Sequence, residues 1–77
     1  MPSERFGIFV VAPGVSSYVA NIDADTTVWQ VCLHIADELA IPVEQQRIFF
    51  NNQELIVEQT LGEAGVLPEM TLFVVSR

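Results

Sequence analysis

The chain has 77 residues, of which 51% are hydrophobic, so it can form one small domain and is too apolar for a disordered segment. Its single cysteine excludes an internal disulfide. No apolar run reaches the roughly 18–20 residues that cross a bilayer, and no secretory signal is visible. Ten acidic residues against three arginines and no lysine give a net charge of −7, which excludes nucleic acid and disfavours anionic membranes as partners.

A β-hairpin is predicted at the start of the chain. Residues 5–12 are rich in β-branched and aromatic side chains, which are typical of a strand. Pro13-Gly14 predicts a turn, and residues 17–23 predict a second, weaker strand.

An amphipathic helix is predicted next. Thr27 and Gln30 have the spacing of a capping box, in which each side chain satisfies a backbone N–H of the first turn. Apolar residues then recur along one helical face to about Ala40, before Pro42: Val28, Val31, Ile35 and Leu39.

Three short strands are predicted in the second half, over residues 46–51, 53–55 and 70–76. Asn51-Asn52 tolerates the left-handed backbone of a tight turn between the first two. Thr60 and Glu63 form a second capping box and predict a short helical turn. The order is β-β-α-β-β-β, which indicates an α+β fold of two layers in which one helix covers one face of a sheet.

The other face of that sheet has no helix to cover it. Strand alternation places Phe6, Ile8 and Val10 on the covered face and Phe9 and Val11 on the open one. By the same rule, four apolar side chains on adjoining strands are left without cover, which predicts a protein-binding surface: Val11, Phe49, Phe73 and Val75. The alternative is that a homodimer or a flanking segment covers them.

The ten residues from Ile41 to Phe50, Ile-Pro-Val-Glu-Gln-Gln-Arg-Ile-Phe-Phe, closely resemble the Ile-Pro-Pro-Asp-Gln-Gln-Arg-Leu-Ile-Phe of ubiquitin and ubiquitin-like domains. The resemblance extends without a gap from Phe6 to Arg77. It implies the β-grasp fold: a mixed sheet of four to five strands with one amphipathic helix packed on one face. It also implies that residues 1–77 form a single domain, which we expect to be the N-terminal module of a larger protein.

The resemblance also implies a functional surface on the open sheet face. The isoleucine at the centre of the family's patch corresponds to Phe49, and the histidine and valine of its last strand correspond to Phe73 and Val75. The patch leucine of the first turn becomes Pro13, and a neighbouring lysine becomes Val11. Arg47 and Arg77 flank this surface, and we expect Arg47 to contact an acidic group of a partner.

Several departures from ubiquitin bear on conjugation. The sequence ends at Arg77 before the diglycine tail of the family, so conjugation is not expected. All seven lysines on which ubiquitin chains are built are replaced, by Val11, Ser16, Cys32, His34, Glu38, Gln53 and Pro68. A buried lysine–carboxylate pair becomes Cys32 and Val57, an exchange that can be neutral or stabilising.

These features resemble the ubiquitin-like domains of shuttle proteins such as ubiquilins. The implied function is a non-catalytic module, in the cytoplasm or nucleus, that binds proteasome receptors, ubiquitin-interacting helices or ubiquitin-associated domains as a monomer or weak dimer. Two alternatives stay open: a constitutive structural subunit resembling elongin B, and a modifier truncated before its diglycine.

No cofactor, metal ion or enzymatic activity is expected, because the sequence lacks a phosphate loop, a metal-ligand set and an activated nucleophile. We interpret Cys32 as a packing residue and His34 as solvated. Trp29 is interpreted as a lid on the loop at 56–57, with a binding anchor as the alternative. Asp37, Glu38, Glu54 and Glu58 are interpreted as solvated acids.

Overall fold

A computed structural model describes residues 4–76 of the chain. It begins with a β-hairpin of β1 (Phe6–Ala12) and β2 (Val15–Ile22). Ala12 pairs with Val15, so only Pro13 and Gly14 form the turn, and Gly14 has a φ of 78° that a glycine adopts without strain. Because this turn is so short, β2 begins at Val15, two residues earlier than predicted.

The capping box at Thr27 starts the main helix, α1 (Val28–Leu39), as predicted. The Thr27 hydroxyl accepts the Gln30 N–H at 3.2 Å, and the Gln30 side chain accepts the Thr27 N–H at 2.9 Å. The helix ends at Leu39, because the next residue, Ala40, has a left-handed φ of 58°. A short 3-10 turn, η1 (Val43–Gln45), follows Pro42. The sequence pattern did not predict this turn.

The second half follows the predicted order. β3 (Gln46–Phe50) and β4 (Gln53–Glu54) are joined by Asn51 and Asn52, both with positive φ, as in the tight turns that suit a hairpin. The second capping box opens the single turn of α2 (Leu61–Ala64), and β5 (Thr71–Ser76) closes the chain.

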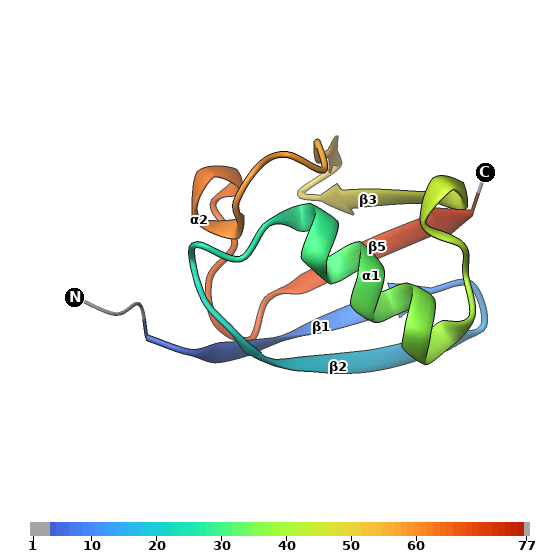
Figure 1. The fold of residues 1–77 in the computed structure, drawn as a ribbon, viewed down its shortest axis with the longest axis horizontal. Coiled ribbons are helices and arrows are strands. Elements are labelled where there is room, and N and C mark those ends of the chain that lie inside the picture. Colours follow the sequence, from blue (N-terminus) through green and yellow to red (C-terminus); the bar gives the residue numbers. More distant parts are fainter. Residues whose placement is uncertain (1–3, 77) are drawn as a thin grey trace.

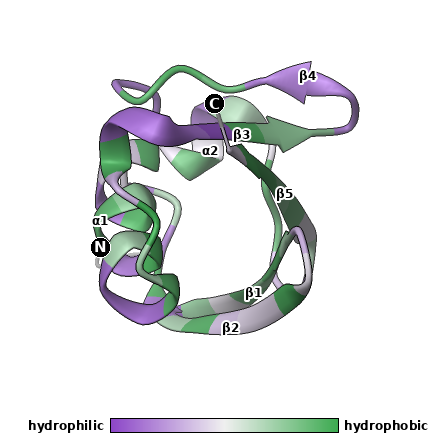
Figure 2. Ribbon diagram, turned by 90° about the vertical axis from the view of Figure 1, so that its right-hand side faces the viewer, coloured by the Kyte–Doolittle hydropathy of each residue, from purple (hydrophilic) through white to green (hydrophobic). Residues whose placement is uncertain are grey.

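The five strands form one mixed sheet in the order β2-β1-β5-β3-β4. β1 and β5 pair in parallel at its centre, and the other pairs are antiparallel. Figure 1 shows α1 crossing in front of this sheet, and Figure 2 shows the sheet curving around the helix. This is the mixed sheet with one covered face that was predicted, so the β-grasp prediction is confirmed.

The core lies between α1 and the sheet. It is apolar apart from Gln46, and its most deeply buried side chains include Ile8, Val10, Ile35, Leu61 and Leu72. The buried Gln46 amide donates to the carbonyl oxygens of Cys32 at 3.0 Å and Ile41 at 2.9 Å, which ties the middle of α1 and the segment after it to the start of β3. Within residues 4–76, no helix is long and apolar enough to span a bilayer.

Candidate protein-interaction surface

The strand register brings the predicted residues together on the face of the sheet opposite α1. Val11 pairs with Phe73 across β1 and β5, and Phe73 pairs with Phe49 across β5 and β3. Two residues further along β5, on the same face, Val75 pairs with Arg47 of β3. All five residues nominated from the sequence therefore belong to one surface, which we call the open face. Its apolar members on β1 and β5 are exposed, and Phe49 is half-buried.

A shallow apolar hollow lies within the open face, at the end nearest the β3–β4 turn. Its lining combines three of the predicted residues with the turn and the start of β5: Phe49, Asn51, Asn52, Thr71, Phe73 and Val75. The strands beneath are fixed by their ladder of backbone hydrogen bonds. The hollow is therefore a preformed apolar depression with the Asn51 and Asn52 amides at its edge. Such a depression can accommodate an apolar side chain of a partner.

Arg47 forms the charged edge of the open face, and its environment differs from the prediction. Its guanidinium makes two hydrogen bonds to the Glu54 carboxylate, from Nη2 at 3.0 Å and from Nε at 3.3 Å. It also lies 5.2 Å above the centre of the Phe49 ring. Glu54 is exposed, as expected for a solvated acid, but it is also paired with Arg47, which was not predicted. Its carboxylate raises the pKa of Arg47. Arg77 lies outside the described residues.

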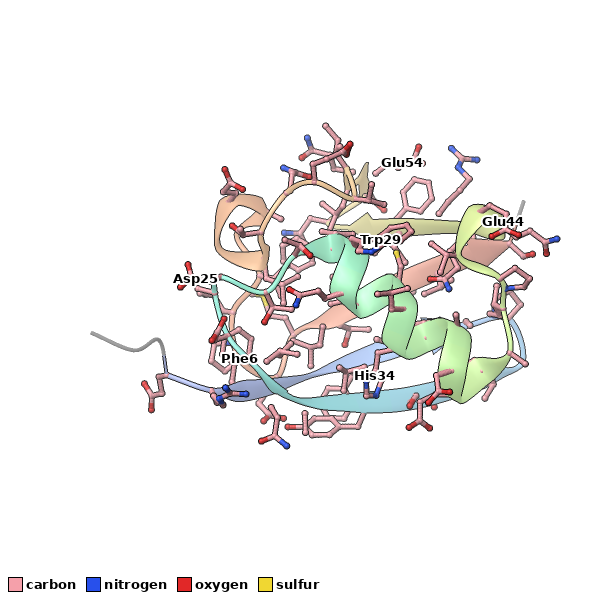
Figure 3. The ribbon with its side chains drawn as sticks, in the orientation of Figure 1. Phe6, Asp25, Trp29, His34, Glu44 and Glu54 are labelled. Carbon is pink, nitrogen blue, oxygen red and sulfur yellow. The ribbon has the colours of Figure 1, made fainter. Side chains whose placement is uncertain are left out.

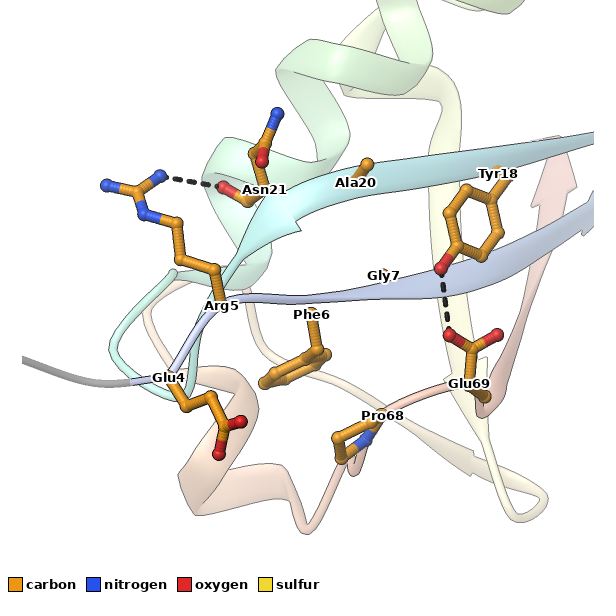
Figure 4. A pocket seen from close by; sticks show the side chains of 9 residues that line it. All are labelled: Glu4, Arg5, Phe6, Gly7, Tyr18, Ala20, Asn21, Pro68 and Glu69. Carbon is orange, nitrogen blue, oxygen red and sulfur yellow. Dashed lines mark hydrogen bonds between the residues drawn. The ribbon is translucent and has the colours of Figure 1, made fainter.

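The open face extends further toward β2 than the sequence analysis indicated. The Phe9 and Tyr18 rings pack edge to face with centres 5.0 Å apart, and both side chains are nearly half exposed. The Tyr18 hydroxyl donates to the Glu69 carboxylate at 2.9 Å, and this bond raises the pKa of Tyr18 (Figure 4). The alternation placed Phe9 on this face, whereas adding Tyr18 required the β1–β2 register.

Gly7 explains why Tyr18 can lie flat against the sheet. A Cβ atom at position 7 would come within 2.1 Å of the Tyr18 hydroxyl oxygen, so the ring occupies the space that a side chain would need. Figure 4 shows Tyr18 beside Gly7 and directed at Glu69. Because Gly7 has no side chain, the Tyr18 ring can pack against the sheet there and form the edge of the open face on β2.

The remaining candidates do not form a reactive site. Cys32 is buried, and burial raises the pKa of its thiol, so it is a packing residue as interpreted and not an activated nucleophile. His34 lies 3.8 Å from Glu38 on the exposed surface of α1. Within the part of the chain that the structure describes, no group of three histidine, cysteine or acidic side chains could hold a metal ion.

The sheet topology, the single covering helix and the open apolar face define a ubiquitin-like β-grasp domain. Residues 8–77 match the model of the ubiquitin family, and the chain belongs to that family. Among solved structures, it is similar to the UBL domain of Dsk2 from Plasmodium falciparum. The two share 29% sequence identity with a TM-score of 0.89, over 96% of this chain and 100% of the other. The resemblance drawn from residues 41–50 is thus confirmed.

Proposed function

We propose that this chain is a non-catalytic protein-interaction module that binds its partner through the open face. The observation that carries the proposal is the row of Val11, Phe73 and Phe49 across three paired strands, with an apolar hollow beside it. Exposed apolar surface of this extent on a soluble domain is typical of interaction sites. Aromatic side chains at its centre are the kind that dominate binding energies.

The partners that fit best are proteins of the ubiquitin–proteasome pathway. The similarity to the UBL domain of Dsk2 supports the expected relation to shuttle proteins. The partner classes we propose are proteasome receptors, ubiquitin-interacting helices and ubiquitin-associated domains, met in the cytoplasm or nucleus. Phe49 and Phe73 would be the anchors, with Val11 and Val75 around them. Because Arg47 is already paired with Glu54, it would offer a partner acid its remaining N–H groups.

A calorimetric titration with a ubiquitin-interacting helix tests this proposal. We expect Phe49→Ala to weaken binding about tenfold or more, the loss typical of a central anchor, while the circular dichroism of the domain is unchanged. Leu67→Ala is the control, since Leu67 is an exposed apolar residue that lies outside the open face. Equal affinity of Phe49→Ala and the unmodified chain would contradict the proposal.

The extent of the open face also favours a second candidate, a constitutive subunit of a complex. Five of its apolar or aromatic side chains are more than a third exposed: Phe9, Val11, Tyr18, Phe73 and Val75. A sixth, Phe49, lines the hollow. A subunit deprived of its permanent partner should self-associate in size-exclusion chromatography. A transient docking module should elute as a monomer or weak dimer.

We further propose that the domain functions as one module of a larger protein. A denaturing immunoblot of the endogenous protein, with deconjugating proteases inhibited, tests this directly. A single band well above 8.6 kDa is expected. A small free form together with a ladder that collapses when deconjugating enzymes act would instead identify a conjugated modifier.

A further inference from the structure

A second group of exposed apolar side chains lies on the helix side of the molecule, away from the open face. We call it the helix-side patch, and its members are Trp29 at 45% exposed, Leu33 at 47%, Ile56 at 61% and Val57 at 37%. Trp29 and Leu33 are one turn apart on α1, and Ile56 and Val57 belong to the segment between β4 and α2. Trp29 was predicted to pack as a lid on this segment, and nearly half of the residue is exposed there.

Backbone hydrogen bonds join these two elements into one surface. The Trp29 N–H donates to the Val57 carbonyl oxygen at 2.9 Å, and the Val28 N–H donates to the Gln59 carbonyl oxygen at 2.8 Å. The loop is also tied internally, because the Ile56 N–H donates to the Gln59 side chain at 2.9 Å. Leu33 follows Trp29 at the i+4 spacing that places two side chains on the same flank of a helix. The patch is thus preformed, with little ordering left to do on binding.

The charges around the helix-side patch are negative. Glu58 follows Val57 directly, and Asp37 lies one helical turn beyond Leu33; both are exposed. The arginines among the described residues lie elsewhere: Arg47 is over Phe49 on the open face, and Arg5 donates to the Asn21 carbonyl oxygen at the end of β2. Figure 3 shows Trp29 on the upper side of α1 and His34 on its lower side. An apolar centre with an acidic rim complements an apolar segment with basic flanks.

From this combination we propose that the helix-side patch binds a short amphipathic helix of another protein, with lysine or arginine residues flanking its apolar side. Trp29 is the central anchor, since tryptophan buries a large area and is enriched among residues that dominate binding. A second copy of this chain is a poor occupant, because each copy carries a net charge of −7 and would bring acids against acids. The patch and the open face lie on opposite sides of the sheet, so the domain binds two partners at once.

The fluorescence of Trp29 provides a direct test, because it is the only tryptophan in the chain. The titrant is a synthetic amphipathic helix of leucine and lysine that contains no tryptophan. Binding at the patch transfers the indole from water to an apolar contact, so we expect a blue shift of its emission that saturates. The same peptide with glutamate in place of lysine should give no shift at equal concentration.

Substitutions by the uncharged residue glutamine then show where on the domain the peptide binds. Leu33→Gln on the helix and Ile56→Gln on the loop should each weaken binding about tenfold, as expected for a residue beside the anchor. Leu67→Gln is the matched control, since Leu67 is 59% exposed but is not part of the patch. Having one variant on each element keeps the test valid if one of them fails to fold. Glu58→Gln removes a charge at the rim of the patch and should weaken binding. Glu38→Gln should weaken it less, because Glu38 lies on the flank of α1 occupied by His34.

The outcomes separate this proposal from the proposed function. Weakening by Leu33→Gln and Ile56→Gln, with Phe49→Ala unchanged, supports the helix-side patch. Weakening by Phe49→Ala alone would place the peptide on the open face and overturn it. Equal binding of the glutamate peptide, or equal loss in Leu67→Gln, would also overturn it by showing unspecific adsorption. Self-association that Leu33→Gln abolishes in sedimentation velocity would make a second copy the occupant.

Discussion

The two faces of the central strands carry the same kinds of side chain in opposite environments. In β5, Leu72 and Val74 are 0% and 2% exposed, whereas their neighbours Phe73 and Val75 are 51% and 42% exposed. One face packs on α1, and the other has no covering element among the described residues. The difference teaches that apolar composition alone does not assign a residue to stability or to binding. Residues on the face covered by α1 contribute to stability, and residues on the opposite face are available for binding.

The sharpest way to test this comparison is to truncate neighbouring residues of β5. Leu72→Ala removes buried methyl groups and leaves a cavity, so we expect it to lower the free energy of unfolding by about 2–5 kcal/mol. Phe73→Ala removes a larger but exposed side chain and should lower it by less than about 1 kcal/mol. Urea unfolding followed by circular dichroism measures both. Comparable losses in the two variants would contradict the division between the faces.

The covered face contains one polar exception, and replacing it tests how much of the stability depends on hydrogen bonds. Gln46→Leu removes the two bonds to the Cys32 and Ile41 carbonyl oxygens, so we expect a loss of about 1–3 kcal/mol. Gln45→Leu is the control, since Gln45 is the exposed neighbour. The same urea experiment compares them, and equal stability of the two variants would show that the buried amide contributes nothing.

The smallest effect is expected at the edge of the open face, where Tyr18 binds Glu69. That hydrogen bond favours the neutral phenol and raises the pKa of Tyr18 above its ordinary value of 10.0. The stabilising contribution is therefore present below the pKa of the unfolded chain and is lost as the pH rises through the folded pKa. We expect Glu69→Gln to lower the pKa of Tyr18, and Gly7→Ala to do the same by displacing the ring.

Phenolate absorbance measures this pKa without ambiguity, because Tyr18 is the only tyrosine in the chain. Ser17→Ala, at the neighbouring position of β2, is the control and should leave the titration unchanged. If Glu69→Gln also left it unchanged, Glu69 would not be the cause of the shift.

Local chemistry made much of the fold predictable. The capping boxes at Thr27 and Thr60, and the left-handed turn at Asn51-Asn52, lie where expected because each depends on residues within one turn of the chain. Alternation along single strands was also sufficient to nominate Phe49, Phe73 and Val75. The start of β2 was predicted two residues late, because Val15 and Ser16 lack a strong strand pattern.

Features that join distant segments could not be predicted in this way. Tyr18 and Glu69 are 51 residues apart, and their contact depends on how β2, β1 and the segment before β5 align. The pairing of Arg47 with Glu54 needed the β3–β4 register, which places Glu54 opposite Phe49. Gln46 was recognised only as part of the family motif, and its hydrogen bonds to the Cys32 and Ile41 carbonyl oxygens became evident from the fold.

The central position of β5 has a consequence for how the domain forms during translation. β5 is the last of the five strands in chain order, yet it lies between β1 and β3 and connects the hairpin β1–β2 to the pair β3–β4 within the sheet. A nascent chain without residues 71–76 would have two separate ribbons and an unfilled space beneath α1. We therefore expect the domain to fold only after this segment has left the ribosome, with the apolar sides of both ribbons exposed until then.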